Sequence, residues 1–411
     1  MKIYKIIAMS AAAVMMTVGL TACTTFENFK EAFFDTKKSS DATVTIGIYE
    51  PMSGADSEGA AEEIQGIELA HEVYPNVNGR IVELTYSDNA SDIYAAETAI
   101  NDLIAKNPDI ILGSYGSVYS LIAGEYINEA KIPTIAMTNM NPLITQNYDY
   151  YFRVCYVDSD QGDILGRYIL EAKGETTAGI LMPRDDDAAM ATGTAFTDRV
   201  EGETGNEEAI TVYEQYDTGD KDFEEQLNVI KESGVKSVLL PGTMEDSAKI
   251  INQAADMGLD VVFLGDIDWA SEEFRDLLQD NVSPDHMAFI NFFTQEQAVS
   301  EESEKFIEAY QTKYGTEKDP PDSVALGYDA YIIALNAIDE AGDDITGENL
   351  RKILAESSSF EGASGTITFN SDGDPIRTAY ISTWRDGDMV SIYTVKMCIR
   401  DRYWRNQRKR K

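Results

Sequence analysis

Short apolar runs alternate with longer segments of helical periodicity from Thr43 onwards. The run Thr43–Tyr49 predicts a buried strand, and Gly59–Val73 carries apolar residues at the spacing of an amphipathic helix. The same strand–helix unit recurs between Arg80 and Lys106 and again in Ile110–Ala130. Repeated units of this size predict a parallel sheet that is covered by helices on both faces.

A second run of such units follows Tyr151–Val157. Helix and strand patterns alternate between Gly162 and Leu264, and two further helices are predicted at Ser303–Tyr314 and Ser323–Ala341. The chain has 411 residues, which is too long for a single core of ordinary size. Two runs of similar rhythm therefore predict an α/β protein with two lobes, each built on a doubly wound sheet.

The segment Pro108–Pro142 combines the features that a ligand site on an open sheet needs. A strand at Ile110–Leu112 runs into the loop Gly113–Ser117, and a helix is predicted directly afterwards. A second strand, Thr134–Met137, leads into the small-residue loop Thr138–Pro142. Open parallel sheets bind ligands at the carboxyl ends of their strands, and a helix N-terminus there favours an anion. The segment predicts a site for a ligand carboxylate.

Composition argues against several other functions. A formal charge of −39 disfavours nucleic acid as a partner, because phosphates need a basic face. His71 and His286 have no Cys or His nearby at ligand spacing, so we expect no metal site. Cys155 lies in an apolar strand and is expected to be a small buried residue. The sequence contains no GxGxxG, P-loop, GxSxG or HExxH motif, so we expect a binding protein without a cofactor and not an enzyme.

The N-terminus resembles a secretory signal peptide, because two lysines precede an apolar run that is too short for a transmembrane helix. Leu20–Cys23 resembles the lipobox of bacterial lipoproteins, which are cut before the cysteine and lipidated on it. We expect residues 1–22 to be removed, Cys23 to anchor the protein outside the cytoplasm to the bacterial cell membrane, and residues 23–42 to form a tether. An ordinary signal peptide that ends near a cysteine is the alternative.

The C-terminal residues 397–411 break with the acidic composition, since they contain seven Arg or Lys residues and one acidic residue, Asp401. The stretch Met397–Arg402 resembles a translated sequencing-adapter end of the kind left in metagenomic assemblies. We interpret this tail as non-native, with the natural chain continuing differently after about Lys396. The alternative is a basic tail that binds an acidic surface.

Several short patches carry a family likeness between Thr43 and Thr394. They are Ile46-Gly47-Ile48 with Pro51-Met52-Ser53-Gly54, Ile111-Leu112-Gly113 with Gly116-Ser117, Ile132-Pro133, Asn141-Pro142, Phe152-Arg153 with Asp158-Ser159-Asp160-Gln161-Gly162, and Gly327-Tyr328-Asp329-Ala330. In this order and spacing they resemble the substrate-binding proteins of branched-chain amino acid ABC importers (the Leu/Ile/Val-binding family), which have the periplasmic-binding fold of the first type.

The resemblance implies two lobes joined by three crossovers, with a ligand trapped between them by hinge closure. Lobe 1 would comprise residues 43–157 and 291–375, and lobe 2 residues 158–290 and 376–396. The implied function is an extracytoplasmic solute-binding protein that captures an amino acid, branched-chain or related, and delivers it to ABC permease subunits. A ligand-sensing lipoprotein that acts with a membrane receptor shares the fold and the anchor, and it is the alternative function.

The resemblance also assigns ligand-binding residues in lobe 1 by position. Ser117 would hold the ligand carboxylate with its hydroxyl and N–H groups, although a helix N-cap is the other usual role of such a serine. The next loop would contribute Thr138, Asn139 and the backbone of Met140. Methionine stands at Met140 where many relatives have threonine, so side-chain specificity stays open.

In lobe 2 the resemblance assigns carboxylates to the ligand ammonium. Asp158 would neutralise it, and a second carboxylate, Asp268 or Asp266, would come from the loop after a strand. An uncompensated ammonium between closed lobes would be costly, so at least one carboxylate is physically required. A hinge or helix-capping role is the alternative for Asp158.

Aromatic residues of the family pattern are missing at two places, near Glu58-Gly59-Ala60 and near Ala188. Tyr115 or Trp269 could replace them against the ligand. Tyr328, from the last matching patch, is a further candidate for the site. Plain packing is the alternative role for Trp269 and Tyr328.

Overall fold

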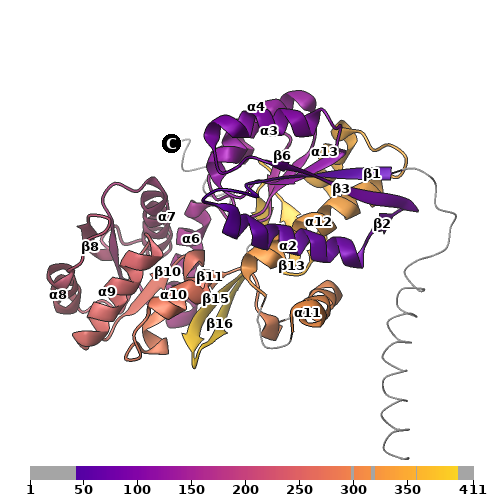
Figure 1. The fold of residues 1–411 in the computed structure, drawn as a ribbon. Helices are drawn as coiled ribbons and strands as arrows, with labels where there is room; N and C mark the ends of the chain where they lie inside the picture. Colours follow the sequence, from indigo (N-terminus) through magenta and orange to yellow (C-terminus); the bar gives the residue numbers. More distant parts are fainter. Residues whose placement is uncertain (1–42, 298–299, 316–319, 358, 397–411) are drawn as a thin grey trace, which may run out of the picture.

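The computed structural model describes residues 43–297, 300–315, 320–357 and 359–396, which form two lobes (Figure 1). The sheet of lobe 1 has the strand order β2-β3-β1-β4-β5-β6, and β1 pairs in parallel with β3 and β4. Its strands are β1 (Thr43–Glu50), β2 (Asn76–Val77), β3 (Arg80–Asp88), β4 (Ile110–Gly113), β5 (Thr134–Ala136) and β6 (Tyr151–Arg153). Every residue of β4, β5 and β6 is buried, as expected for parallel strands covered on both faces.

The helices of lobe 1 come from two distant parts of the chain. They are α2 (Ser57–Val73), α3 (Ile93–Ile104), α4 (Ser117–Ala130), α5 (Leu143–Gln146), α11 (Glu301–Tyr314), α12 (Asp322–Ala341) and α13 (Gly347–Glu356). A small antiparallel sheet of β12 (Phe360–Gly362), β13 (Gly365–Phe369) and β14 (Pro375–Ile376) follows them. In Figure 1 the orange helices α12 and α13 lie among the indigo elements of lobe 1, so the late segment completes this lobe.

The sheet of lobe 2 has the strand order β16-β15-β11-β10-β9-β7-β8. Its strands are β7 (Ala178–Pro183), β8 (Ile210–Tyr216), β9 (Ser237–Leu239), β10 (Val262–Gly265), β11 (Met287–Asn291), β15 (Thr378–Arg385) and β16 (Asp388–Lys396). Its helices are α6 (Asp158–Tyr168) with a π-helical turn η1 (Ile169–Lys173), α7 (Asp187–Thr204), α8 (Glu224–Ser233), α9 (Met244–Asp256), η2 (Ile267–Ala270), α10 (Glu272–Leu277) and η3 (Pro284–His286). The strands from β7 to β11 are parallel, and β15 and β16 extend one edge of the sheet by antiparallel pairing.

The chain passes between the two lobes three times, after β6, after β11 and between β14 and β15. The Arg377 side chain, on the third crossover, is 2% exposed. It donates to Val154 O on the first crossover at 2.8 Å and to Phe292 O on the second at 3.1 Å. One guanidinium group therefore binds the backbone of all three crossovers together.

The predicted fold class, an α/β protein of two parallel-sheet lobes with a three-crossover hinge, is confirmed. Some elements differ from the sequence prediction: α6 starts at Asp158 and not at Gly162, and α10 and α13 were not predicted. The predicted signal peptide, the tether with Cys23 and the C-terminal tail lie outside the described residues. In the part of the chain that the structure describes, no helix is long and apolar enough to span a membrane.

Close helix pairs in both lobes depend on glycine. A Cβ atom on Gly66 of α2 would lie 2.0 Å from Val324 O of α12, and one on Gly327 of α12 would lie 2.2 Å from Glu63 O of α2. In lobe 2 a Cβ on Gly162 of α6 would lie 2.0 Å from Thr192 O of α7. Backbone atoms cannot yield as a flexible side chain can, so any larger residue must push the helices apart.

We expect Gly66→Ala to lower the free energy of unfolding by about 2 kcal/mol, because overpacking costs more than the gain in helix propensity. Gly193→Ala on α7 is the matched control, since its Cβ would lie 3.4 Å from Met182 Sδ in ordinary contact. That variant should be neutral or slightly stabilising. Chemical denaturation measures both, and equal stability of the two variants would contradict the packing argument.

Candidate ligand-binding site

The loop after β4 has a backbone conformation that depends on two glycines. Gly113 and Gly116 have φ values of 122° and 84°, which side chains rarely tolerate. Gly116 is the N-cap of α4, so Ser117 is the first helical residue and not the cap. The Ser117 hydroxyl accepts a hydrogen bond from Asn141 N at 3.5 Å, which joins this loop to the one after β5. Ser117 is partly exposed, so its hydroxyl remains accessible at the N-terminus of α4.

The loop after β5 holds the three other predicted residues of lobe 1. The Thr138 hydroxyl donates to a carboxylate oxygen of Glu63. Asn139 is buried, and its Nδ2 atom has no hydrogen-bond partner within the described residues. Met140 is partly buried, and its sulfur accepts a hydrogen bond from Gln161 Nε2 at 3.2 Å. The structure thus brings Ser117, Thr138, Asn139 and Met140 to one edge of lobe 1.

A buried arginine supports the second loop from behind. The Arg153 side chain is fully buried and forms an ion pair with Asp374 at 2.9 Å. The same guanidinium donates to Asn139 O at 2.6 Å and to Thr145 Oγ1 at 2.9 Å. Because the Arg153 guanidinium donates to groups of the protein, it holds the loop after β5 in place. The ligand carboxylate must therefore be bound by other groups.

Three carboxylates of lobe 2 gather at the facing edge. Asp158 is the first residue of α6, and burial raises the pKa of its carboxyl to about 6. Asp266 directly follows β10 and caps η2, because its carboxylate accepts a hydrogen bond from Asp268 N at 3.1 Å. Burial first, and then the Asp268 charge, raise the pKa of Asp266. The Asp268 side chain is exposed, but the protein around it and the Glu245 carboxylate still raise its pKa. The raised pKa values indicate that no positive group among the described residues fully compensates the ionised forms of these three carboxyl groups. A ligand cation would supply that compensation.

Gln161 connects the two lobes at this place. Its side chain is buried, and its Oε1 atom accepts a hydrogen bond from Ile267 N in the acidic loop at 3.1 Å. Its Nε2 atom is the group that donates to Met140 in lobe 1. Burial first, and then the charges of Glu63 and of Asp268 in lobe 2, raise the pKa of Tyr115 in lobe 1.

The three aromatic candidates occupy different environments. Tyr115 lies over Gly59, where a Cβ would be 2.3 Å from the Tyr115 ring, so this ring packs against the segment in which the family aromatic is missing. Trp269 is fully buried and stacks on Phe274 with ring centroids 4.7 Å apart. Tyr328 is also fully buried and donates to Glu302 at 2.7 Å. Among these aromatics, Tyr115 alone is partly exposed, and the positions of Trp269 and Tyr328 match the packing alternative.

Sequence reasoning missed four groups that the structure places at the site: Glu50, Glu63, Gln161 and Arg153. Gln161 and Arg153 stood in the patches of family likeness without a role. Glu63 had a detectable signal, because it lies in the apolar stripe of α2 with Ala60 and Ile67 at helical spacing. Glu50 had no such signal in the sequence, because a single glutamate in so acidic a chain is expected to lie at the solvated surface.

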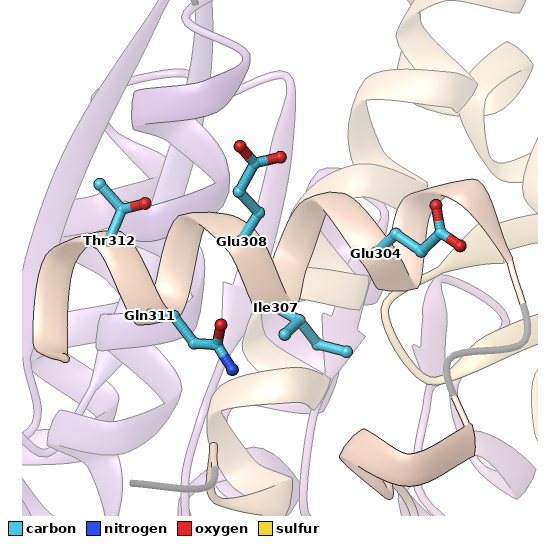
Figure 2. A pocket seen from close by; sticks show the side chains of 5 residues that line it. All are labelled: Glu304, Ile307, Glu308, Gln311 and Thr312. Atoms are coloured by element: carbon cyan, nitrogen blue, oxygen red, sulfur yellow. The ribbon is translucent and has the colours of Figure 1, made fainter. Parts of the chain in front are cut away.

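A depression of about 390 Å³ lies on the surface of α11. Figure 2 shows that its five lining side chains all come from this one helix: Glu304, Ile307, Glu308, Gln311 and Thr312. Among the described residues no second element contributes a converging polar group, so the depression lacks the enclosure of a small-molecule site. Within the described residues no group of three or more His, Cys, Asp or Glu side chains is arranged to hold a metal ion.

A sequence profile described as periplasmic binding protein matches residues 43–388, which is most of the chain. The chain belongs to the periplasmic binding protein family. The family consists of substrate-binding proteins, in agreement with two lobes whose polar edges face each other.

Relatives and solved structures agree with this membership. The Leu/Ile/Val-binding protein homolog 2 of Brucella abortus is 25% identical over 356 residues, covering 85% of this chain and 92% of the relative. The leucine binding protein LivK of Thermotoga maritima has a TM-score of 0.71 at 27% identity and covers 86% of this chain and 99% of its own. The branched-chain amino acid transporter substrate binding protein LivJ of Streptococcus pneumoniae, in complex with isoleucine, has a TM-score of 0.70 at 26% identity, with coverage of 86% and 99%. The predicted resemblance to branched-chain amino acid binding proteins is therefore confirmed.

Proposed function

We propose that this protein is the extracytoplasmic solute-binding protein of an ABC importer, which captures an amino acid between its lobes and delivers it to a permease. The observation that carries the proposal is that groups suited to an anion on lobe 1 face groups suited to a cation on lobe 2. Lobe 1 presents the N-terminus of α4 and the Ser117 hydroxyl, which suit a carboxylate. Lobe 2 presents Asp158, Asp266 and Asp268, which suit an ammonium group.

The names of the relatives support an amino acid as the ligand, since they refer to leucine, isoleucine and valine. In the proposed complex Thr138, Asn139 and Met140 line the carboxylate side, and Tyr115 covers the ligand from lobe 1. Trp269 and Tyr328 support the site from the cores of the two lobes. Lipidated Cys23 would hold the protein at the membrane beside its permease. A permease or ATPase gene beside this one would favour uptake, and a receptor gene would favour sensing.

A thermal-shift screen against the twenty amino acids and a set of small carboxylates tests the proposal. A ligand that binds only the folded state raises the melting temperature with its concentration. We expect at least one amino acid to stabilise the protein. If no amino acid stabilises it while a simple carboxylate does, the proposed ligand class is wrong.

Removal of the Asp158 carboxylate tests the ammonium side. We expect Asp158→Ala to weaken binding of the amino acid found in the screen by tenfold or more, because the ammonium would lose one of the carboxylates that compensate its charge. The fold should persist, since no other side chain donates a hydrogen bond to this carboxylate in the described structure. Isothermal calorimetry measures the affinity, with Asp185→Ala in the exposed loop after β7 as the control. Unchanged affinity of Asp158→Ala would remove this residue from the site.

A further inference from the structure

Two fully buried glutamates lie directly behind the ligand loops of lobe 1. Glu50 ends β1, and its Oε2 atom accepts a hydrogen bond from Tyr115 N at 2.6 Å. Glu63 lies on α2, and its Oε1 atom accepts from the Thr138 hydroxyl. The remaining oxygens, Glu50 Oε1 and Glu63 Oε2, are buried and accept no hydrogen bond from any donor among the described residues. The two carboxyl groups are close enough that each shifts the pKa of the other.

Two carboxylates in such contact cannot both be ionised, because like charges at this distance repel strongly in a buried environment. A shared proton between Glu50 and Glu63 satisfies both orphaned oxygens at once. Burial, and then the Glu63 charge, raise the pKa of Glu50 well above its ordinary value. Burial raises the pKa of Glu63 to about 7, so the pair exchanges its second proton near neutral pH.

Among the described residues, the cation that lies near the pair, Arg153, does not cancel its charge. The titratable or charged groups that surround it are Tyr49 on β1, Glu62 on α2, Tyr115 after β4, Tyr151 and Arg153 on β6, and Cys155 after β6. Arg153 is committed to Asp374. On α12, which packs against α2, Asp322 accepts from the backbone N–H groups of Phe292 and Phe293, and Tyr328 donates to Glu302. A negative charge on the Glu50–Glu63 pair therefore acts mainly on a ligand bound at the loops after β4 and β5.

We propose that Glu50 and Glu63 belong to the ligand site as a proton-sharing pair, and that a ligand carboxylate seated on the loops of lobe 1 draws a second proton from solvent onto this pair. The proposal rests on the proposed function in one respect, namely that the ligand carries a carboxylate on this side. Neither glutamate contacts the ligand, so both are positioning residues.

The Thr138 hydroxyl transmits the change. While Glu63 is ionised, this hydroxyl donates its hydrogen to Glu63 and presents only lone pairs elsewhere, which repel a carboxylate. When the second proton arrives on Glu63, the carboxyl no longer needs this donor. The Thr138 hydrogen can then rotate towards the ligand carboxylate. The pair thus converts Thr138 from an acceptor to a donor and removes a buried negative charge in the same step.

Affinity should fall as the pH rises through the range in which the pair loses its second proton. We expect the dissociation constant for the amino acid found in the screen to increase about fivefold between pH 6 and pH 8, since binding and protonation are linked. Calorimetry at pH 7.5 in phosphate and in Tris, which differ in ionisation enthalpy, should show uptake of a fraction of a proton per ligand. Proton release, or no exchange, in the unmodified protein would overturn the proposal.

Glutamine variants separate charge from structure. The double variant Glu50→Gln/Glu63→Gln has a permanently neutral pair, so it should bind without proton uptake and should lose the fall in affinity between pH 6 and pH 8. Its remaining pH dependence should have the opposite sign, because Asp158, with a pKa of about 6, becomes more fully ionised as the pH rises. Glu50→Gln alone leaves Glu63 as a buried group that can still take up a proton, so this variant should retain proton uptake and a fall in affinity with rising pH. Glu62→Gln, on the next position of α2, is the control and should retain the uptake. Proton uptake in the double variant would contradict the assignment.

The free protein provides a test that needs no ligand. A carboxyl whose pKa is raised in the folded state contributes stability at low pH, and this is lost as the pH rises from about 4.5 to about 7. Denaturation midpoints of the unmodified protein should fall over this range relative to those of the double variant. If the midpoints of both proteins change with pH in the same way, Glu50 and Glu63 do not share a proton. If no amino acid binds, the proposed function fails, and this comparison still decides the nature of the pair.

Discussion

Replacing Arg153 by methionine is expected to lower the free energy of unfolding by about 3–5 kcal/mol, the usual cost of breaking a buried ion pair. The change leaves Asp374, which is 4% exposed, without its charge partner. It also removes the donors that hold Asn139 O and Thr145 in the loop after β5. Amino-acid affinity should fall as well, although Arg153 does not need to touch the ligand, because Thr138 and its neighbours lose their fixed position.

Chemical denaturation and calorimetry measure the two effects of Arg153→Met. Arg351→Met is a suitable control, because Arg351 also lies in lobe 1 but donates to Asp149 O at the surface. Its effect should stay below about 1 kcal/mol. The double variant Arg153→Met/Asp374→Leu should recover part of the lost stability, since an apolar pair avoids the unpaired charge. Additive losses in this double-mutant cycle would show that the ion pair is not what holds the loop.

The fold was largely predictable because its signals are local. Buried parallel strands such as Ile110–Gly113 appear as short apolar runs, and α12 carries a long apolar side, so the order of elements in two lobes follows from the pattern. Helix α10 was missed because its six residues are too few for periodicity to be recognised. The apolar pattern placed the start of α6 at Gly162, and only the capping alternative for Asp158 indicated an earlier start, because the first turn is polar.

The site was predictable only where one short segment contains it. The loops around Ser117 and Thr138 follow strands directly, so the sequence could place them at one sheet edge. The burial of Trp269 and Tyr328 could not be predicted, because an aromatic side chain suits both a core and a ligand wall. The pairing of Glu50 with Glu63 depends on how α2 packs beside β1, and no spacing in the sequence encodes that contact.

The hinge shows the same limit, because Arg377 contacts residues that are distant in the sequence. Val154 and Phe292 belong to the first two crossovers, and only the folded chain brings them to one guanidinium. The group also lies 4.8 Å from the centroid of the Phe292 ring, which stacks on Tyr156. Charge, ring contacts and main-chain hydrogen bonds are thus concentrated at the point about which the lobes would rotate.

We expect Arg377→Met to lower the free energy of unfolding by about 3–4 kcal/mol, because two buried carbonyl groups lose charge-assisted hydrogen bonds and gain no other partner. Arg377→Lys should recover little of this, since a single ammonium cannot reproduce the fork of a guanidinium. Arg385→Met on β15 is the matched control; its ion pair with Asp285 is exposed, and its loss should cost less than about 1 kcal/mol. Denaturation of the three variants measures these differences. If the free energy of unfolding of Arg377→Met lies within 1 kcal/mol of that of the unmodified protein, the crossovers are held together by other contacts. Arg377 would then not be the residue about which the lobes rotate during closure.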